Sequence, residues 1–190
     1  MIEKLIRKIK RKLGIVSSYK SETSKVRQIV LAYCNGEGCD IGFGGDKIKK
    51  ENCIGIDLQI PYTKTGIDLV DVACKIGEEP IPFANDTFDY VYSSHLIEDF
   101  KDTKHVLLDF IRVLKNNGNL ILVFPDQQVY EKHCQKTGQP LNMYHIHKDM
   151  SMDYMLKVIN SISDIKYELL LQNNCIVDYN VILVLKIKKL

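Results

Sequence analysis

The chain has 190 residues, of which 45% are apolar and 26% are charged, and its formal net charge is +2. This length and composition suit one globular domain with a substantial core, and they exclude a disordered chain. The near balance of charge gives no argument for a nucleic-acid partner. No apolar stretch reaches the ~18 residues of a membrane-spanning helix. The six cysteines form no CxxC pair, so we expect reduced, mostly buried thiols and a cytoplasmic location.

Residues 1–13 (MIEKLIRKIKRKL) combine an apolar stripe at helical spacing with six basic residues. Such a basic amphipathic helix can pack on the domain, or it can lie on an anionic membrane surface as a peripheral contact. We favour packing or a loose arm, because stripes at this spacing usually face a core. Gly14 is expected to end the helix, and residues 17–24 to form a polar linker. The predicted organisation is therefore a helix and linker over 1–24 and a domain over 25–190.

The rest of the chain alternates short apolar segments with helical patterns. The predicted strands are 38–43, 53–58, 67–72, 88–93, 119–124, 166–172 and 180–187. Helices are expected after an N-cap at Asp102 or Thr103 and over 152–162, whereas 26–33 fits either a helix or a strand. Apolar strands between helices indicate a parallel sheet buried on both faces, and the closely joined last two strands must be antiparallel. The prediction is a Rossmann-like, doubly wound α/β fold with a mostly parallel seven-stranded sheet and an antiparallel C-terminal strand.

A glycine-rich turn follows the first predicted strand, in the segment GEGCDIGFGG (36–45). Asp40 lies near the end of the strand, and Gly42 and Gly44 lie in the turn. Glycines allow positive φ and a close approach of the backbone to a ligand. In doubly wound sheets, ligands bind over the carboxyl ends of the strands.

Two further acids strengthen this prediction. Asp57 closes the second predicted strand, where a carboxylate can accept both hydroxyls of a ribose. Asp71 closes the third, where it can accept a hydrogen bond from an adenine amino group. Together with Asp40 they are expected to face one crevice that binds a nucleoside. The dinucleotide pattern G-x-G-x-x-G fails, because Lys47 occupies the place of the third glycine.

Four blocks of this sequence resemble the class I S-adenosylmethionine (SAM)-dependent methyltransferases, in particular small bacterial methyltransferase-domain proteins. They are CDIGFGGDKI, GIDL, GIDLVDVACKIGEEPIPFANDTFDYVYSSHLIED and IRVLKNNGNLILVFPD. The blocks run in the order and spacing of that family and cover about residues 38 to 126. The resemblance implies an enzyme with SAM as its cofactor.

The resemblance also implies a role for each matching residue. The methionine part of SAM would lie against Asp40, Gly42 and Gly44. The ribose and adenine would contact Asp57, Leu58, Asp71 and Val72. The methyl group and the acceptor would be lined by Ser93, Ser94 and His95.

Two departures from the family pattern leave room for altered binding or chemistry. Asp46 replaces a third glycine of the turn, and Glu98-Asp99 replaces the usual Glu-His pair. A module that binds SAM or its product without transferring a methyl group, or a silent partner subunit, therefore stays open as an alternative.

His95 is the candidate catalytic base, because its ordinary pKa suits proton acceptance at neutral pH. The alternative, which we favour, is that it caps the next helix or touches the cofactor. Glu98 is interpreted as a structural acid.

A second group of histidines follows the fifth strand. His133 and Cys134 precede the segment NMYHIH (142–147), but their spacing is not that of a standard zinc site, and we expect no metal. The segment is instead predicted to form a wall of the acceptor pocket, where Tyr130, Tyr144 and His147 would contact a polar acceptor. A surface loop is the simpler alternative.

The sequence therefore predicts methyl transfer from SAM to a small molecule or to a sugar or glycan hydroxyl. The basic N-terminal helix would suit work near lipid-linked sugars. Nucleic acid is an unlikely acceptor class, since no Asn-Pro-Pro-Tyr type motif and no aromatic-basic platform occur. The oligomeric state stays open.

Overall fold

The structure, a computed structural model, describes residues 21–61 and 64–190. Its centre is a seven-stranded sheet with the order β3-β2-β1-β4-β5-β7-β6. The strands are β1 (Gly38–Ile41), β2 (Cys53–Asp57), β3 (Val72–Ala73), β4 (Phe88–Ser94), β5 (Leu114–Pro125), β6 (Ile165–Val177) and β7 (Asn180–Lys189). Pairs from β3 to β5 are parallel, and β7 is antiparallel to both of its neighbours. The predicted doubly wound α/β sheet with an antiparallel C-terminal strand is confirmed.

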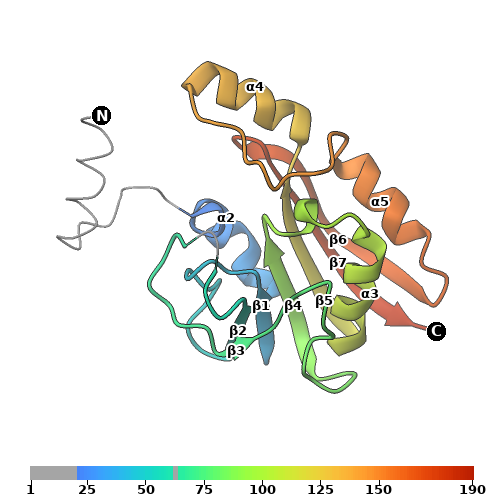
Figure 1. Ribbon diagram of the computed structural model, residues 1–190. Helices are drawn as coiled ribbons and strands as arrows, with labels where there is room; N and C mark the ends of the chain where they lie inside the picture. Colours follow the sequence, from blue (N-terminus) through green and yellow to red (C-terminus); the bar gives the residue numbers. More distant parts are fainter. Residues whose placement is uncertain (1–20, 62–63) are drawn as a thin grey trace.

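Helices cover both faces of the sheet (Figure 1). On one face, α3 (Thr103–Val113) and α5 (Met152–Asn160) contribute Phe110 and Met155 to the larger buried core. On the other face, α2 (Glu22–Val30) and the 3₁₀ turn η1 (Leu31–Tyr33) cover a second core, in which Val26 packs with Tyr92. Burial on both faces explains why the central strands are apolar without alternation.

The predicted N-cap of α3 is confirmed. Asp102 caps the helix and accepts a hydrogen bond from the backbone N–H of His105 at 2.9 Å. The helix ends at Val113 and the chain passes directly into β5, within which the register shifts near Asn117, a residue with a φ of 63°. An N-cap carboxylate satisfies a backbone donor that has no partner within the helix.

The predicted linker is wrong for residues 21–24, because α2 begins there. Ser21 is the N-cap of this helix and accepts a hydrogen bond from the backbone N–H of Ser24 at 2.9 Å. The polar residues that suggested a linker are therefore a capped first helical turn. The apolar segment that fitted either a helix or a strand belongs to α2 and η1.

The predicted strand over 67–72 is wrong in its bounds. Only Val72 and Ala73 pair with β2, and Ile67 and Leu69 are about four-fifths exposed. At the edge of a sheet there is no second neighbour to pair with such a segment, so its apolar residues do not identify a strand. Asp71 consequently precedes β3 instead of closing it.

The sequence analysis also missed α4 (Gln127–Thr137), although both of its ends carry ordinary signals. Asp126 caps its first turn by accepting a hydrogen bond from Val129 N–H at 3.1 Å, and Gly138 ends it with a φ of 71°. Figure 1 shows α2 and α4 at the end of the sheet toward which β4 points.

The predictions for residues 1–20, including the basic helix and Gly14, lie outside the described residues. Within the described part of the chain, no helix is both long enough and apolar enough to cross a membrane.

Candidate active site

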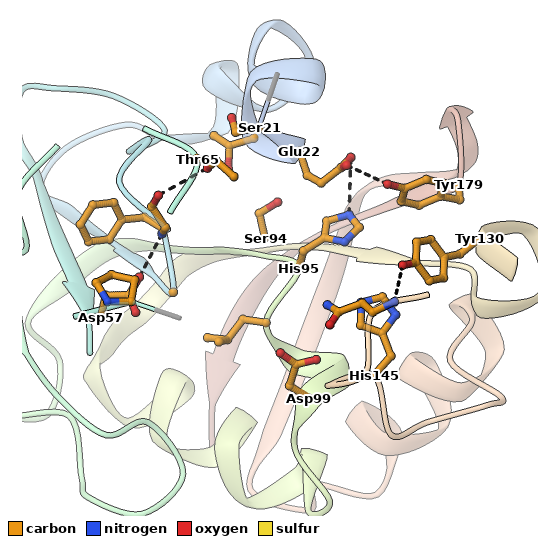
Figure 2. A pocket seen from close by; sticks show the side chains of 17 residues that line it. Ser21, Glu22, Asp57, Thr65, Ser94, His95, Asp99, Tyr130, His145 and Tyr179 are labelled. Atoms are coloured by element: carbon orange, nitrogen blue, oxygen red, sulfur yellow. Dashed lines mark hydrogen bonds and ion pairs between the residues drawn. The ribbon is translucent and has the colours of Figure 1, made fainter. Parts of the chain in front are cut away.

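A pocket opens over the carboxyl ends of β1, β2 and β4, where the strand order reverses between β1 and β4 (Figure 2). Ligands of doubly wound sheets bind at this switch point. The pocket is lined by Ser21, Glu22, Thr23, Gly42, Phe43, Gly44, Asp57, Pro61, Thr65, Ser94, His95, Leu96, Asp99, Tyr130, Asn142, His145 and Tyr179. Figure 2 shows Asp57 on one side of the pocket and His95, Tyr130, His145 and Tyr179 on the other.

The first side is built by the glycine turn after β1. Gly42 has a φ of 73°, and a Cβ at this position would lie 2.6 Å from the side chain of Leu96. The backbone N–H of Gly44 donates a hydrogen bond to Asp57 Oδ2 at 2.9 Å, and Leu58 N–H donates to Oδ1 at 2.7 Å. Burial raises the pKa of Asp57, against the effect of these two hydrogen bonds. The turn and the carboxylate are thus fixed to each other and face one pocket, whereas Leu58 itself does not line it.

Asp40 lies beneath this turn and does not reach the pocket. Its side chain is fully buried, and Oδ2 accepts a hydrogen bond from Ile48 N–H at 2.6 Å. Oδ1 has no hydrogen-bond partner among the described residues. Burial raises the pKa of Asp40 well above its ordinary value. This position suits a role in holding the turn better than direct contact with a ligand.

Asp71 is not brought together with the other two acids. Its Oδ2 accepts hydrogen bonds from Gly55 N–H at 2.7 Å and Lys47 Nζ at 2.8 Å. Burial acts to raise the pKa of Asp71, but Lys47 and Gly55 outweigh it and the pKa is lowered. Val72, the first residue of β3, packs against the larger core. The expectation that three strand-end acids face one crevice is therefore wrong. Only Asp57 lines the pocket, because Asp40 is buried beneath the turn and Asp71 precedes β3.

The departure at Asp46 has a structural explanation. Asp46 Oδ1 lies 2.6 Å from Arg27 Nη2, and its Oδ2 accepts a hydrogen bond from Ser21 Oγ. Arg27 belongs to α2, and Ser21 is the cap of that helix. The carboxylate therefore ties the glycine turn to the helix end that lines the pocket, which a glycine could not do.

Of the three residues predicted at the end of β4, one has a structural role and two line the pocket. Ser93 is buried and donates its hydroxyl hydrogen bond to Ile41 O at 2.9 Å, whereas Ser94 and His95 line the pocket. Burial acts to lower the pKa of His95, but the carboxylates of Glu98 and Glu22 outweigh it and raise the pKa to about 9. The imidazole is a cation at neutral pH in this state, which disfavours a role as a general base.

Only one of the three residues predicted to contact the acceptor lines the pocket. Tyr130, on α4, lines the pocket, and its hydroxyl accepts a hydrogen bond from Asn142 N–H at 2.8 Å. Tyr144 is about half exposed and does not line the pocket. His147 lies elsewhere, with Nε2 2.6 Å from Phe100 O and 3.2 Å from Thr103 Oγ1. Its imidazole joins the start of α3 to the loop before α5.

Sequence reasoning missed several residues of the second side. Glu22 comes from the capped turn of α2, and Tyr179 from the turn between β6 and β7, where its hydroxyl donates to Glu22 Oε1 at 2.7 Å. His145 comes from the loop after α4. The predicted wall segment 142–147 does line the pocket, but through Asn142 and His145 and not through Tyr144 and His147. Glu22 and Tyr179 lie outside any motif, and only the N-cap pattern at Ser21 could have indicated Glu22.

The histidines and cysteine considered for zinc do not meet. Within residues 21–61 and 64–190, the group with three potential metal donors is instead His95, Glu98 and His145. Glu98 is fully buried in η2 (Ile97–Asp99). His145 thus pairs with residues about 50 positions earlier in the chain and not with its sequence neighbours.

Comparison with known proteins agrees with this geometry. Residues 38–122 match the family described as "Methyltransferase domain". An uncharacterized protein of Methanocaldococcus jannaschii, MJ1123, is 26% identical over 136 residues, which cover 63% of this chain and 60% of that protein. The chain therefore matches less than two thirds of the length of this curated relative.

Solved structures share the fold at low sequence identity. A SAM-dependent methyltransferase from Thermotoga maritima has a TM-score of 0.64 and 16% identity, over 98% of each chain. A SAM-dependent methyltransferase from Archaeoglobus fulgidus has a TM-score of 0.61 and 15% identity, over 86% of this chain and 92% of that one.

Proposed function

We propose that the chain is a class I methyltransferase that takes the methyl group from SAM and transfers it to a hydroxyl of a small molecule or sugar. The match of residues 38–122 to the family described as "Methyltransferase domain" supports this proposal. The observation that carries the proposal is the two-sided pocket. Its first side has the glycine turn and Asp57, and its second side has polar and aromatic groups suited to a hydroxylated acceptor.

The residues of the first side fit SAM. Asp57 retains acceptor capacity on both oxygens, because each accepts only one backbone hydrogen bond, and two oxygens can receive two ribose hydroxyls. Gly42 keeps the turn close to Leu96, because a Cβ at this position would lie 2.6 Å from that side chain. Asp40 places a carboxylate oxygen without a partner beneath the turn, where it favours a cationic amino group through a bridging water.

The second side suits a polar acceptor. Tyr130 and Tyr179 form an aromatic wall, with ring centroids 4.9 Å apart. Asn142 and His145 add hydrogen-bonding groups to the same side. Aromatic faces combined with a few polar groups bind hydroxylated ligands by stacking and by hydrogen bonds that fix orientation.

SAM supplies a methyl group that is already activated toward a nucleophile. The chain's own task is then to hold the two reactants in line and to exclude water, which can lower the barrier by roughly 7 kcal/mol or more. The glycine turn and Asp57 fix one reactant. The wall of Tyr130 and Tyr179 orients the other.

Two measurements test this function with the full chain. Isothermal titration with SAM and with S-adenosylhomocysteine should show binding at one site. Transfer of labelled methyl from SAM should then be found with at least one member of a panel of sugars, glycans and hydroxylated small molecules. Absence of SAM binding by the folded protein would overturn the proposal. Tight binding without turnover on any acceptor would favour the binding module.

A further inference from the structure

The second side of the pocket has a cluster whose groups come from three separate elements. His95 follows β4, Glu98 lies in η2, and His145 lies in the loop between α4 and α5. One potential metal-binding atom from each residue lies within 4.8 Å of the other two. His95 and His145 line the pocket, and Glu98 is the fully buried member behind them.

The carboxylate of Glu98 is fully buried, and the two imidazoles are its nearest charge partners. Among the described residues, no group donates a well-aligned hydrogen bond to either oxygen. The nearest groups are His95 Nδ1 and His145 Nε2, at 3.3 and 3.5 Å from Oε1. An ionised carboxylate is costly to bury unless a cation or donors compensate it.

The protonation pattern of His95 is fixed by its neighbour Asn180. The amide nitrogen of Asn180 donates to Glu22 Oε2 at 2.9 Å and to Val177 O at 3.0 Å. Its oxygen therefore faces His95 Nε2, 2.6 Å away, and accepts the Nε2–H hydrogen bond. The ring atom that faces Glu98 is then Nδ1, which carries the second proton of the cation in the metal-free protein and would give it up to a metal ion.

The same arrangement is repeated at His145. The amide nitrogen of Gln127 donates to Glu131 Oε1 at 3.1 Å, so its oxygen faces His145 Nδ1 at 3.0 Å. Nδ1–H is the donor, and the lone pair of Nε2 is directed to the side of Glu98. Histidines that bind metals commonly donate their other ring N–H to an oxygen in this way, which fixes the tautomer and the ring orientation.

The distances also match a shared ion. Two donor atoms bound to one zinc ion at about 2.0–2.2 Å in a tetrahedral arrangement lie roughly 3.3–3.5 Å apart. The separations of Glu98 Oε1 from the two imidazole nitrogens fall in this range. The two imidazole donors lie within 4.8 Å of each other, so binding an ion of this size would need them to move together by at most about 1.5 Å.

We propose that His95, Glu98 and His145 bind a divalent transition-metal ion on the acceptor side of the pocket. Two imidazole nitrogens and one carboxylate oxygen favour Zn²⁺, Fe²⁺, Co²⁺ or Ni²⁺ over Mg²⁺ and Ca²⁺, which prefer oxygen ligands. Three protein ligands leave coordination positions open, and the two histidines place these toward the pocket. An acceptor held there by a hydroxyl oxygen is a consequence that rests on the proposed function.

The test uses the full chain, stripped with a chelator and titrated with Co²⁺ in the absence of SAM. We expect one equivalent to bind, with visible absorption typical of nitrogen-ligated Co²⁺, and Zn²⁺ to displace it. Glu98→Gln and His145→Phe should each weaken binding by about 100-fold or more. His145→Phe retains an aromatic ring beside Tyr130 and so keeps the packing. The matched control, His147→Gln, should bind Co²⁺ like the wild type.

Circular dichroism shows which variants fold. The two substitutions lie in different elements, so either folded variant tests the site without the other. The proposal is overturned if the folded wild-type protein binds neither ion, in which case a proton alone joins His95 to Glu98. It is also overturned if a folded Glu98→Gln or His145→Phe variant binds Co²⁺ as tightly as wild type. SAM titration of the metal-free protein reports on the proposed function separately, so the two can fail independently.

Discussion

The two sides of the pocket are encoded in different ways. The first side, proposed to bind SAM, comes from two adjacent strands. Its turn and carboxylate lie within residues 42–57 and are joined by the Gly44–Asp57 hydrogen bond. The second side, proposed to bind the acceptor, brings together residues from almost the whole length of the described chain: Glu22, His95, Glu98, His145 and Tyr179. A site formed by one strand–turn–strand unit can be recognised in the sequence as a motif, whereas a site formed by the packing of distant segments cannot.

The largest expected effect on SAM binding distinguishes Asp57 from Asp71, two acids to which the sequence analysis gave similar roles. Asp57→Ala should weaken SAM binding by at least about 100-fold, because two hydrogen bonds to a charged group contribute about 1.5–3 kcal/mol each. Asp71→Ala should change it less than threefold, since its carboxylate bonds Lys47 and Gly55 outside the pocket. Titration calorimetry of both folded variants decides. Equal losses would contradict the division of the two acids.

The pH dependence of stability should differ in sign between Asp40 and Asp71. The pKa of Asp40 is raised in the folded protein, so its contribution is present below the unfolded value of about 3.9 and is lost as pH rises through the folded value. Asp40→Asn should therefore stabilise the protein by about 1 kcal/mol at pH 8, with a gain that shrinks toward pH 5.

Asp71→Asn is the matched control for this experiment. The pKa of Asp71 is lowered on folding, so its contribution is present above the unfolded pKa and is lost as pH falls. This variant should destabilise at neutral pH. Urea unfolding from pH 3 to 8 measures both differences: the gain of Asp40→Asn should grow as pH rises, whereas the loss of Asp71→Asn should be constant above about pH 5 and shrink below the unfolded pKa of about 3.9. The same sign for the two variants would refute the assignment.

A smaller effect is expected where Asp46 connects the glycine turn to α2. Asp46→Ala removes the bonds to Arg27 and Ser21, which should cost about 1–2 kcal/mol of stability. SAM affinity should fall roughly fivefold, because the cap of α2 lines the pocket, and thermal unfolding with SAM titration measures both. An Asp46→Gly variant that binds SAM more tightly than wild type would show that the carboxylate hinders the turn.

The smallest expected effect on binding belongs to His147. His147→Gln should lower stability by about 1 kcal/mol, since its hydrogen bond to Phe100 O is lost or lengthened. SAM affinity should stay within twofold of wild type. A large loss of SAM binding in this variant would show that His147 contributes to the binding site, against its position outside the pocket.

Much of the fold was predictable because its signals are local. Buried strands such as 53–57 read as apolar runs, and Asp102 marks the start of α3. The glycine turn and Asp57 were found for the same reason. The failures at residues 21–24 and 67–72 came from segments whose conformation depends on what lies beside them: α2 docks its cap on Asp46, and β3 has one neighbour only.

The sequence by itself determined the strand–turn–strand unit, since glycine conformation and apolar patterning act over a few residues. Only the tertiary structure decided which acids share a pocket and which tautomers His95 and His145 adopt. Those outcomes depend on hydrogen bonds from Asn180 and Gln127, which are 85 and 18 positions away. A side chain's chemistry is set by its spatial neighbours, and packing alone selects them.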